Sequence, residues 1–105
     1  MKVLCVATDD ASLVALRRAA VAAEWELVGG AKNAAEARIQ LEEERPHFLL
    51  VFGPFAELVA EARERYPTLR IVSDRDLPGA DVVATSLAEV RGALVGAPRP
   101  GGPVR

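Results

Sequence analysis

Short apolar runs alternate along this chain with segments whose apolar residues recur every three or four positions. The first pattern is typical of buried strands and the second of amphipathic helices. Strands are expected at residues 2–7, 26–31, 47–52, 69–73 and 81–84. Helices are expected to begin near Asp10, Asn33, Pro54 and Ser86. The order of these elements alternates strand and helix, which predicts an α/β fold.

Polar residues support the predicted helix starts. Asn33 is followed three residues later by Glu36, and Ser86 by Glu89, and both pairs resemble capping boxes. Pro54 stands at the expected first position of the third helix, where proline is favoured. Residues 8–10 are expected to supply cap residues for the first helix, with Asp10 or Ser12 as the cap.

The strand His47–Phe52 carries no formal charge and lies between Arg45-Pro46 and Gly53-Pro54. Strands covered on both faces read as continuous apolar runs, as in parallel sheets. Right-handed crossovers then favour a flavodoxin-like, doubly wound sheet of five strands in the order 2-1-3-4-5. We expect His47 to be an ordinary histidine at the start of this strand.

The link between the fourth and fifth strands is unusually short. Only residues 74–80 are available, whereas a parallel crossover normally takes a dozen residues or more and includes a helix. The sequence therefore predicts that this helix is missing. Seven residues, at roughly 3.4 Å each, can still return along a short strand, so a parallel fifth strand and an antiparallel hairpin both remain open.

Composition limits the class of protein. The 105 residues suit one domain, predicted at 1–96, followed by a Pro-, Gly- and Arg-rich tail, 97–105, that is expected to be disordered. A net charge of −2 argues against nucleic-acid binding, and no apolar run reaches the roughly 18 residues of a membrane span. The lone Cys5 excludes an internal disulfide and suits a cytoplasmic setting.

The segments 27–37 and 44–52 resemble the second strand, second helix and third strand of response-regulator receiver domains, which are CheY-like. The order of elements agrees over most of residues 1–96, but only these two segments are similar residue by residue. The resemblance implies two-component signal transduction and a site at the carboxyl ends of the strands.

The reactive positions of that family are degenerate in this chain. The phosphoacceptor aspartate falls on Phe52, and the lysine that ends the fifth strand falls on Ala84. Ser73 matches the hydroxyl residue that ends the fourth strand. Receivers bind Mg²⁺ through an acidic pair at the end of the first strand. This pair matches Asp9 and Asp10 only if a gap is placed in the alignment; without the gap it matches Ala7 and Thr8. The resemblance is therefore to a pseudo-receiver that lacks the phosphoacceptor.

Three functions are compatible with these residues. The favoured one is a phosphorylation-independent signalling or scaffolding module that acts by protein–protein contact, without catalytic turnover and without a cofactor. A second is a small-molecule or nucleotide sensor that binds at the carboxyl ends of the first, third and fourth strands. The third is a metal-dependent enzyme that uses Asp9, Asp10 and Asp74.

Two structural expectations accompany the favoured function. Phe52 should fill the vacated site and link the first and third helices to the sheet. Without a fourth helix, Ile71, Leu77 and Val83 should lack cover within the chain. Exposed apolar patches of this kind tend to mark interfaces, so we expect a homodimer that pairs through this region, as receivers commonly do.

Overall fold

The computed structural model describes residues 2–22, 25–86, 88–90 and 92. Its strands are β1 (Lys2–Ala7), β2 (Glu26–Ala31), β3 (Phe48–Phe52), β4 (Arg70–Ser73) and β5 (Val82–Val83). Its helices are α1 (Asp10–Ala22), α2 (Ala34–Glu44) and α3 (Ala56–Arg65). In these ranges, no helix has the length and apolar character that crossing a membrane requires.

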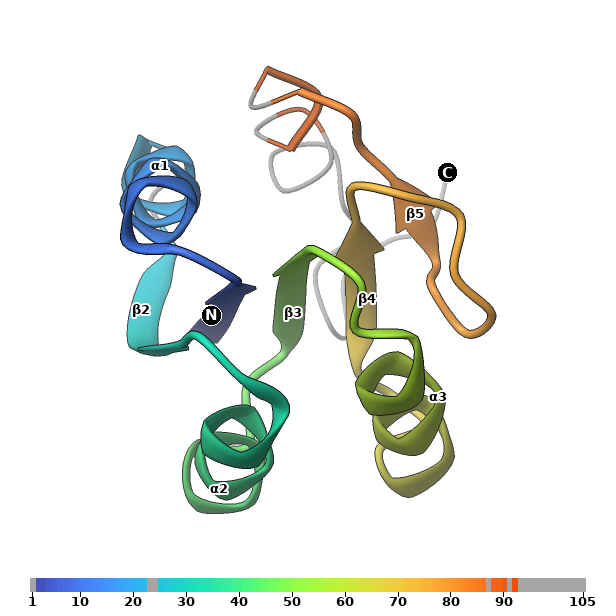
Figure 1. The fold of residues 1–105 in the computed structure, drawn as a ribbon. Coiled ribbons are helices and arrows are strands. Elements are labelled where there is room, and N and C mark those ends of the chain that lie inside the picture. The colour runs from blue at the N-terminus through green and yellow to red at the C-terminus, as the bar shows by residue number, and fades with distance from the viewer. Residues whose placement is uncertain (1, 23–24, 87, 91, 93–105) are drawn as a thin grey trace, which may run out of the picture.

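All neighbouring strands are parallel, and the sheet has the order β2-β1-β3-β4-β5 (Figure 1). The predicted flavodoxin-like, CheY-like fold is confirmed. The fifth strand is short but runs parallel to β4, with Val72 beside Val82 and Ser73 beside Val83. The hairpin alternative is therefore excluded.

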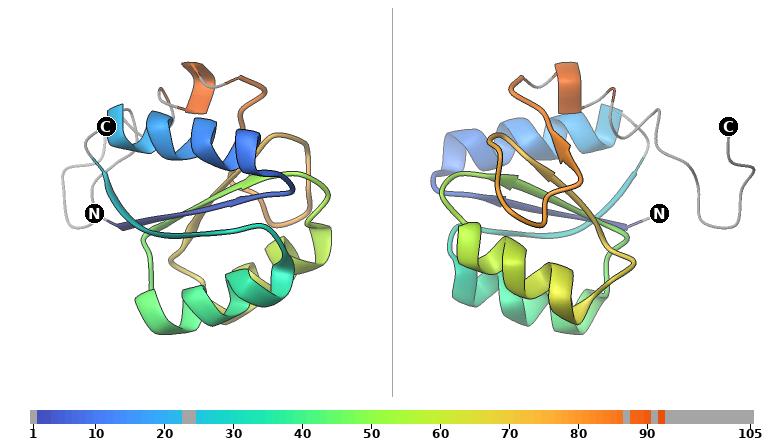
Figure 2. Two further views of the ribbon diagram at one scale, coloured as in Figure 1. Left: turned by 60° about the vertical axis from the view of Figure 1, so that its left-hand side comes forward. Right: turned by 90° about the vertical axis from the view of Figure 1, so that its right-hand side faces the viewer.

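Helices cover both faces of the sheet. Figures 1 and 2 show α1 on one face and α2 with α3 on the other. Alternate residues of β3 serve the two faces: Phe48 and Leu50 join the core beneath α1, and Leu49 and Val51 join the core beneath α2 and α3. This strand is buried from both sides, as its uninterrupted apolar sequence predicts.

The helices begin where the sequence predicts when the capping residues are close neighbours along the chain. The Asn33 side chain accepts a hydrogen bond from the Glu36 N–H at 2.9 Å, and the Glu36 carboxylate accepts one from the Lys32 N–H at 3.1 Å. The cap bond to Asn33 forms as expected, whereas Glu36 bonds to the N–H of Lys32 and not to that of Asn33, so the second bond of the capping box is shifted by one residue. At α1 the cap is Asp9, one of the three residues expected to supply it, which accepts from the Ser12 N–H at 2.7 Å. The more specific expectation of Asp10 or Ser12 is wrong.

The expected start of α3 at Pro54 is also wrong. Gly53 has a φ of 135°, a conformation that side chains rarely adopt. The Phe55 N–H donates to the Gly53 carbonyl at 2.9 Å. This tight turn precedes the helix, so α3 begins only at Ala56.

The link between β4 and β5 forms no helix, and all of residues 74–81 are described. The link folds back onto the face of α2 and α3, where Leu77 and Ala80 pack against the core. Asp81 fixes its end, accepting from the Ile71 N–H at 2.8 Å and from the Arg63 guanidinium of α3. Side chains of the link thus replace the missing helix.

This packing corrects one expectation about exposed residues. Ile71 is fully buried, and Leu77 is half-buried against the core. Only Val83, 44% exposed, remains as an apolar surface residue of the three.

The chain after β5 is described in part. The Ser86 hydroxyl accepts from the Glu89 N–H at 3.2 Å, and Val90 is buried in the core beneath α1. The remainder of the expected last helix, at residues 87, 91 and 93–96, lies outside the described residues, as does the expected tail 97–105.

Candidate functional site

The positions predicted to form a degenerate site lie along one edge of the sheet. Asp9 and Asp10 follow β1, Phe52 ends β3, Ser73 ends β4 and Ala84 follows β5. Because all five strands are parallel, these ends meet at the same carboxyl edge. The topology therefore brings the predicted positions to one place, and the side chains decide what that place can do.

The two aspartates after β1 are engaged locally. Asp9 accepts hydrogen bonds from the Ser12 N–H and from the Ser12 hydroxyl, at 2.7 and 3.1 Å. The bond from the Ser12 N–H, with others in the same turn, holds the pKa of Asp9 below its ordinary value. Asp10 forms an exposed ion pair with Lys32 at 3.1 Å. Asp9 thus caps α1, and Asp10 pairs with the residue that follows β2.

The end of β3 is apolar. The half-buried Phe52 ring packs against the core beneath α1, because its side chain points to that face of the sheet. The third helix packs on the opposite face, so the expectation that Phe52 links α1 to α3 is wrong. Phe52 fills the space on one side only.

Gly53 follows in a crowded place. A Cβ atom at this position would lie 2.9 Å from both the Phe55 ring and the Thr8 methyl group. A side chain of any kind would therefore displace its neighbours, in addition to the strain of the positive φ. A carboxylate cannot be accommodated at this position without rebuilding the turn.

Ser73 and Ala84 are both buried. The Ser73 hydroxyl accepts a hydrogen bond from the Arg75 N–H at 3.2 Å, and the Ala84 N–H donates to the Ser73 carbonyl at 2.8 Å. Ser73 thus shapes the turn after β4. Ala84 offers no cation at the position that the resemblance to receivers matches to a lysine.

Asp74 is the carboxylate that lies beside the end of β3. It accepts from the Gly53 N–H at 3.1 Å and from two nitrogens of Arg75 at 3.1 and 3.2 Å. Burial pushes the pKa of Asp74 upward, but the bonds from Arg75 and Gly53 outweigh it and hold that pKa below its ordinary value. Asp74 joins the two strand ends and is already neutralised.

The metal-dependent alternative finds no support at this edge. In the part of the chain that the structure describes, no three His, Cys, Asp or Glu side chains lie close enough to hold a metal ion. Asp9, Asp10 and Asp74 each engage a different partner instead. They do not converge on a common point.

A cavity of about 740 Å³ lies at the opposite edge, where β3 and β4 begin. Arg45, His47 and Arg70 are among the residues that line it. No pattern in the sequence predicts this cavity. Its arginines come from separate turns that only the folded sheet brings together.

No protein-family model matches the chain, and no curated protein matches it. Solved structures do. The isolated receiver domain of RcsB from Salmonella enterica serovar Typhimurium has a TM-score of 0.71 at 18% identity, over 92% of this chain and 89% of that one. The orphan response regulator HP1043 of H. pylori has a TM-score of 0.73 at 12% identity, over 90% and 96%.

A third similar structure is described as an atypical orphan response regulator with a new phosphorylation-independent regulatory mechanism. Its TM-score is 0.74 at 12% identity, over 91% of this chain and 93% of that one. In a longer RcsB chain from Salmonella typhimurium, the match covers 57% of that protein. At these identities the likeness is one of fold, and the fold is that of receiver domains.

Proposed function

We propose that this chain is a receiver-like signalling module that works without phosphorylation, by contact with another protein. The observation that carries the proposal is the end of β3, where Phe52 packs into the core and Gly53 is closed in by Phe55 and Thr8. Phosphoryl transfer to a receiver needs a carboxylate at this position, a metal ion beside it and a cation to neutralise the charge.

The neighbouring positions support the same proposal. Asp9 is used as a helix cap, Asp74 is paired with Arg75, and Ala84 is a buried apolar residue. One structure of similar fold is described as phosphorylation-independent, which supports the proposal by analogy only. A domain of this fold without a phosphorylation site retains its surfaces, through which it can contact a partner.

The sensor alternative is weaker at the edge where it was expected. Thr8, Gly53 and Phe55 are closely packed at the ends of β1 and β3. The cavity found in this structure lies at the other edge of the sheet. A ligand site at the carboxyl edge is therefore not favoured.

Beryllofluoride, which mimics a phosphoryl group on a receiver aspartate, provides the test. Addition of beryllofluoride and Mg²⁺ should leave the melting temperature of this protein unchanged. A receiver domain that has its aspartate serves as the control and should be stabilised by the bound ligand. A rise in the melting temperature of this chain would contradict the proposal.

A further inference from the structure

The cavity at the amino edge of the sheet has an apolar floor. It opens between the ends of α2 and α3, and its floor includes Leu41 and Leu69, whose side chains belong to the core beneath these two helices. Its volume of about 740 Å³ falls in the range of sites for small molecules, roughly 300–1,000 Å³. None of the residues of the degenerate site lines it.

The charged residues that line this cavity all have the same sign. Arg45, Arg65 and Arg70 line it, and no aspartate or glutamate does. The protein as a whole has a net charge of −2, so this is a local concentration of positive charge that the composition conceals. Electrostatic complementarity favours a negatively charged occupant.

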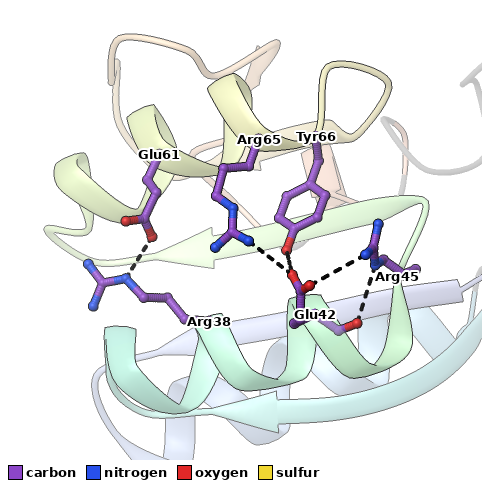
Figure 3. Close-up of polar contacts among 6 residues, drawn as sticks. All are labelled: Arg38, Glu42, Arg45, Glu61, Arg65 and Tyr66. Atoms are coloured by element: carbon purple, nitrogen blue, oxygen red, sulfur yellow. Dashed lines mark hydrogen bonds and ion pairs between the residues drawn. The ribbon is translucent and has the colours of Figure 1, made fainter.

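One carboxylate just outside the cavity shows what the arginines can hold. Glu42 of α2 accepts from the Tyr66 hydroxyl at 2.5 Å, from Arg65 at 3.3 Å and from Arg45 at 3.4 Å (Figure 3). The hydrogen bond from Tyr66, followed by the charges of the two arginines, lowers the pKa of Glu42. Two guanidinium groups thus share a single carboxylate.

The same two guanidinium groups lie against an aromatic ring. Their carbons are 5.5 Å (Arg45) and 5.7 Å (Arg65) from the centre of the Tyr66 ring. This contact and the bonds to Glu42 order both side chains at the rim before any ligand arrives. A preorganised cationic rim costs little entropy on binding.

A simpler interpretation is that the arginines only stabilise helix C-termini, and Arg70 does not fit it. Cations are favourable at helix C-termini, and that effect accounts for Arg45 and Arg65 at the ends of α2 and α3. It does not account for Arg70, which is the first residue of β4. Its exposed guanidinium makes no ion pair with any carboxylate of the described residues.

His47 adds a neutral donor to the lining. Its Nδ1 accepts a hydrogen bond from the Lys2 N–H at 3.1 Å. In the neutral ring the proton is then carried by Nε2, which is free to donate. The cavity thus combines guanidinium and imidazole donors with an apolar floor.

We propose that this cavity binds a small organic anion, composed of a flat apolar body that carries a carboxylate or phosphate group. The body would lie against Leu41 and Leu69, and the oxyanion would face Arg70 with Arg45. Guanidinium groups suit such oxyanions because they donate parallel hydrogen bonds. This site is independent of the proposed signalling function.

Titration of the ¹⁵N-labelled protein tests the proposal. The probes are 1-naphthyl phosphate and 1-naphthoate, with neutral 1-naphthol and inorganic phosphate as controls. Both organic anions, or one of them, should shift the amide signals of the non-proline residues in 45–48 and 65–70, and each control should bind far more weakly. Comparison of the two anions then identifies the preferred oxyanion.

Three variants sharpen the test. Arg70→Gln should weaken binding about tenfold, the usual effect of losing one charged hydrogen bond. Glu42→Gln should strengthen it, because the amide oxygen and the Tyr66 ring still order Arg45 and Arg65 while the competing negative charge is gone. The control is Arg38→Gln, another arginine of α2, which pairs with Glu61 at 2.7 Å outside the cavity and should leave binding unchanged.

Three results would each overturn this site. The first is the absence of localised shifts with either organic anion. The second is binding of 1-naphthol or of inorganic phosphate as tight as that of the organic anions. The third is an Arg70→Gln variant that keeps the wild-type spectrum and binds as well as Arg38→Gln.

Discussion

Phe52 ends β3 at the position that the resemblance to receivers matches to their reactive carboxylate, and its ring is half-buried against the core beneath α1. Its neighbour Gly53 adopts a φ of 135° between Phe55 and Thr8. An apolar ring and a closed turn therefore form the end of β3. The remaining polar groups of this edge pair with one another.

Substitutions at Phe52 test this packing. Phe52→Ala should lower the free energy of unfolding by about 2 kcal/mol, less than the roughly 3–5 kcal/mol of fully buried phenylalanines, because the ring is half-buried. Phe52→Asp should lower it further, since a carboxylate would replace apolar contacts. Urea denaturation measures both, with Phe52→Leu as the conservative control. A stable Phe52→Asp would mean that the site is open to water.

The ionisation of Asp74 makes the free energy of unfolding depend on pH. Its folded-state pKa lies below the ordinary value of 3.8, so its bonds to Gly53 and Arg75 stabilise the fold fully above pH 3.8. That stabilisation is lost as the pH falls below 3.8 through the folded-state pKa. Asp74→Asn should therefore cost about 1 kcal/mol at pH 7 and much less at pH 2.5, by urea denaturation at both values.

The control for this experiment lies in the same link. Asp76 is exposed, so Asp76→Asn should leave the stability unchanged at both pH values. An Asp74→Asn variant whose cost is the same at pH 7 and pH 2.5 would show that the charge of Asp74 does not contribute.

At the scale of elements, the sequence predicts well what neighbouring residues decide. The capping pairs at Asn33 and Ser86 form as expected because partner and cap are three residues apart. The start of α3 was missed because the turn at Gly53 depends on Phe55 and Thr8, and Thr8 follows a different strand. The burial of Ile71 was missed because a seven-residue link, rather than a helix, covers it.

Of the two edges of the sheet, only the carboxyl edge could be predicted as a site from the sequence. The degenerate carboxyl edge follows from strand order, which the alternation of elements reveals. The cavity at the other edge depends on Arg45, Arg65 and Arg70, which lie in different turns and carry no shared motif. Their common position is visible only when β3 and β4 are placed side by side.

Asp81 is the residue on which the short link depends. Its carboxylate bonds to the Ile71 N–H and to Arg63, so it ties β4 to α3 where β5 is too short to do so. Asp81→Ala should cost about 2–3 kcal/mol because it leaves a partly buried N–H unpaired. Hydrogen exchange at Ile71 should accelerate in the same variant.

Asp81→Asn is the matched comparison, because its side-chain oxygen can still accept from Ile71. It should lose less stability than Asp81→Ala. Equal losses in the two variants would mean that the ion pair with Arg63, rather than the bond to Ile71, holds the link.

At the scale of the whole molecule, the surface beside β5 remains the proposed contact between two copies. Val83 is 44% exposed on this outermost strand, and an edge strand offers unpaired backbone groups. Val83→Asp should therefore convert a dimer at micromolar concentration to a monomer, as measured by sedimentation equilibrium. A two-fold contact would repeat the charge on both copies.

An equally exposed valine on another element provides the control. Val14 of α1 is 48% exposed, and Val14→Asp should leave the dimer intact. A wild-type protein that stays monomeric at all concentrations, or a dimer that tolerates Val83→Asp, would remove this contact from the account.

The central claim is that this receiver-like chain takes no phosphoryl group, and intact-mass spectrometry tests it most directly. The protein is incubated with acetyl phosphate and Mg²⁺, beside a receiver domain that has its aspartate. We predict an unchanged mass, because Phe52 ends β3 and cannot form an acyl phosphate. A gain of about one phosphoryl group that hydroxylamine removes would contradict the account, since it would reveal a reactive carboxylate elsewhere in the chain.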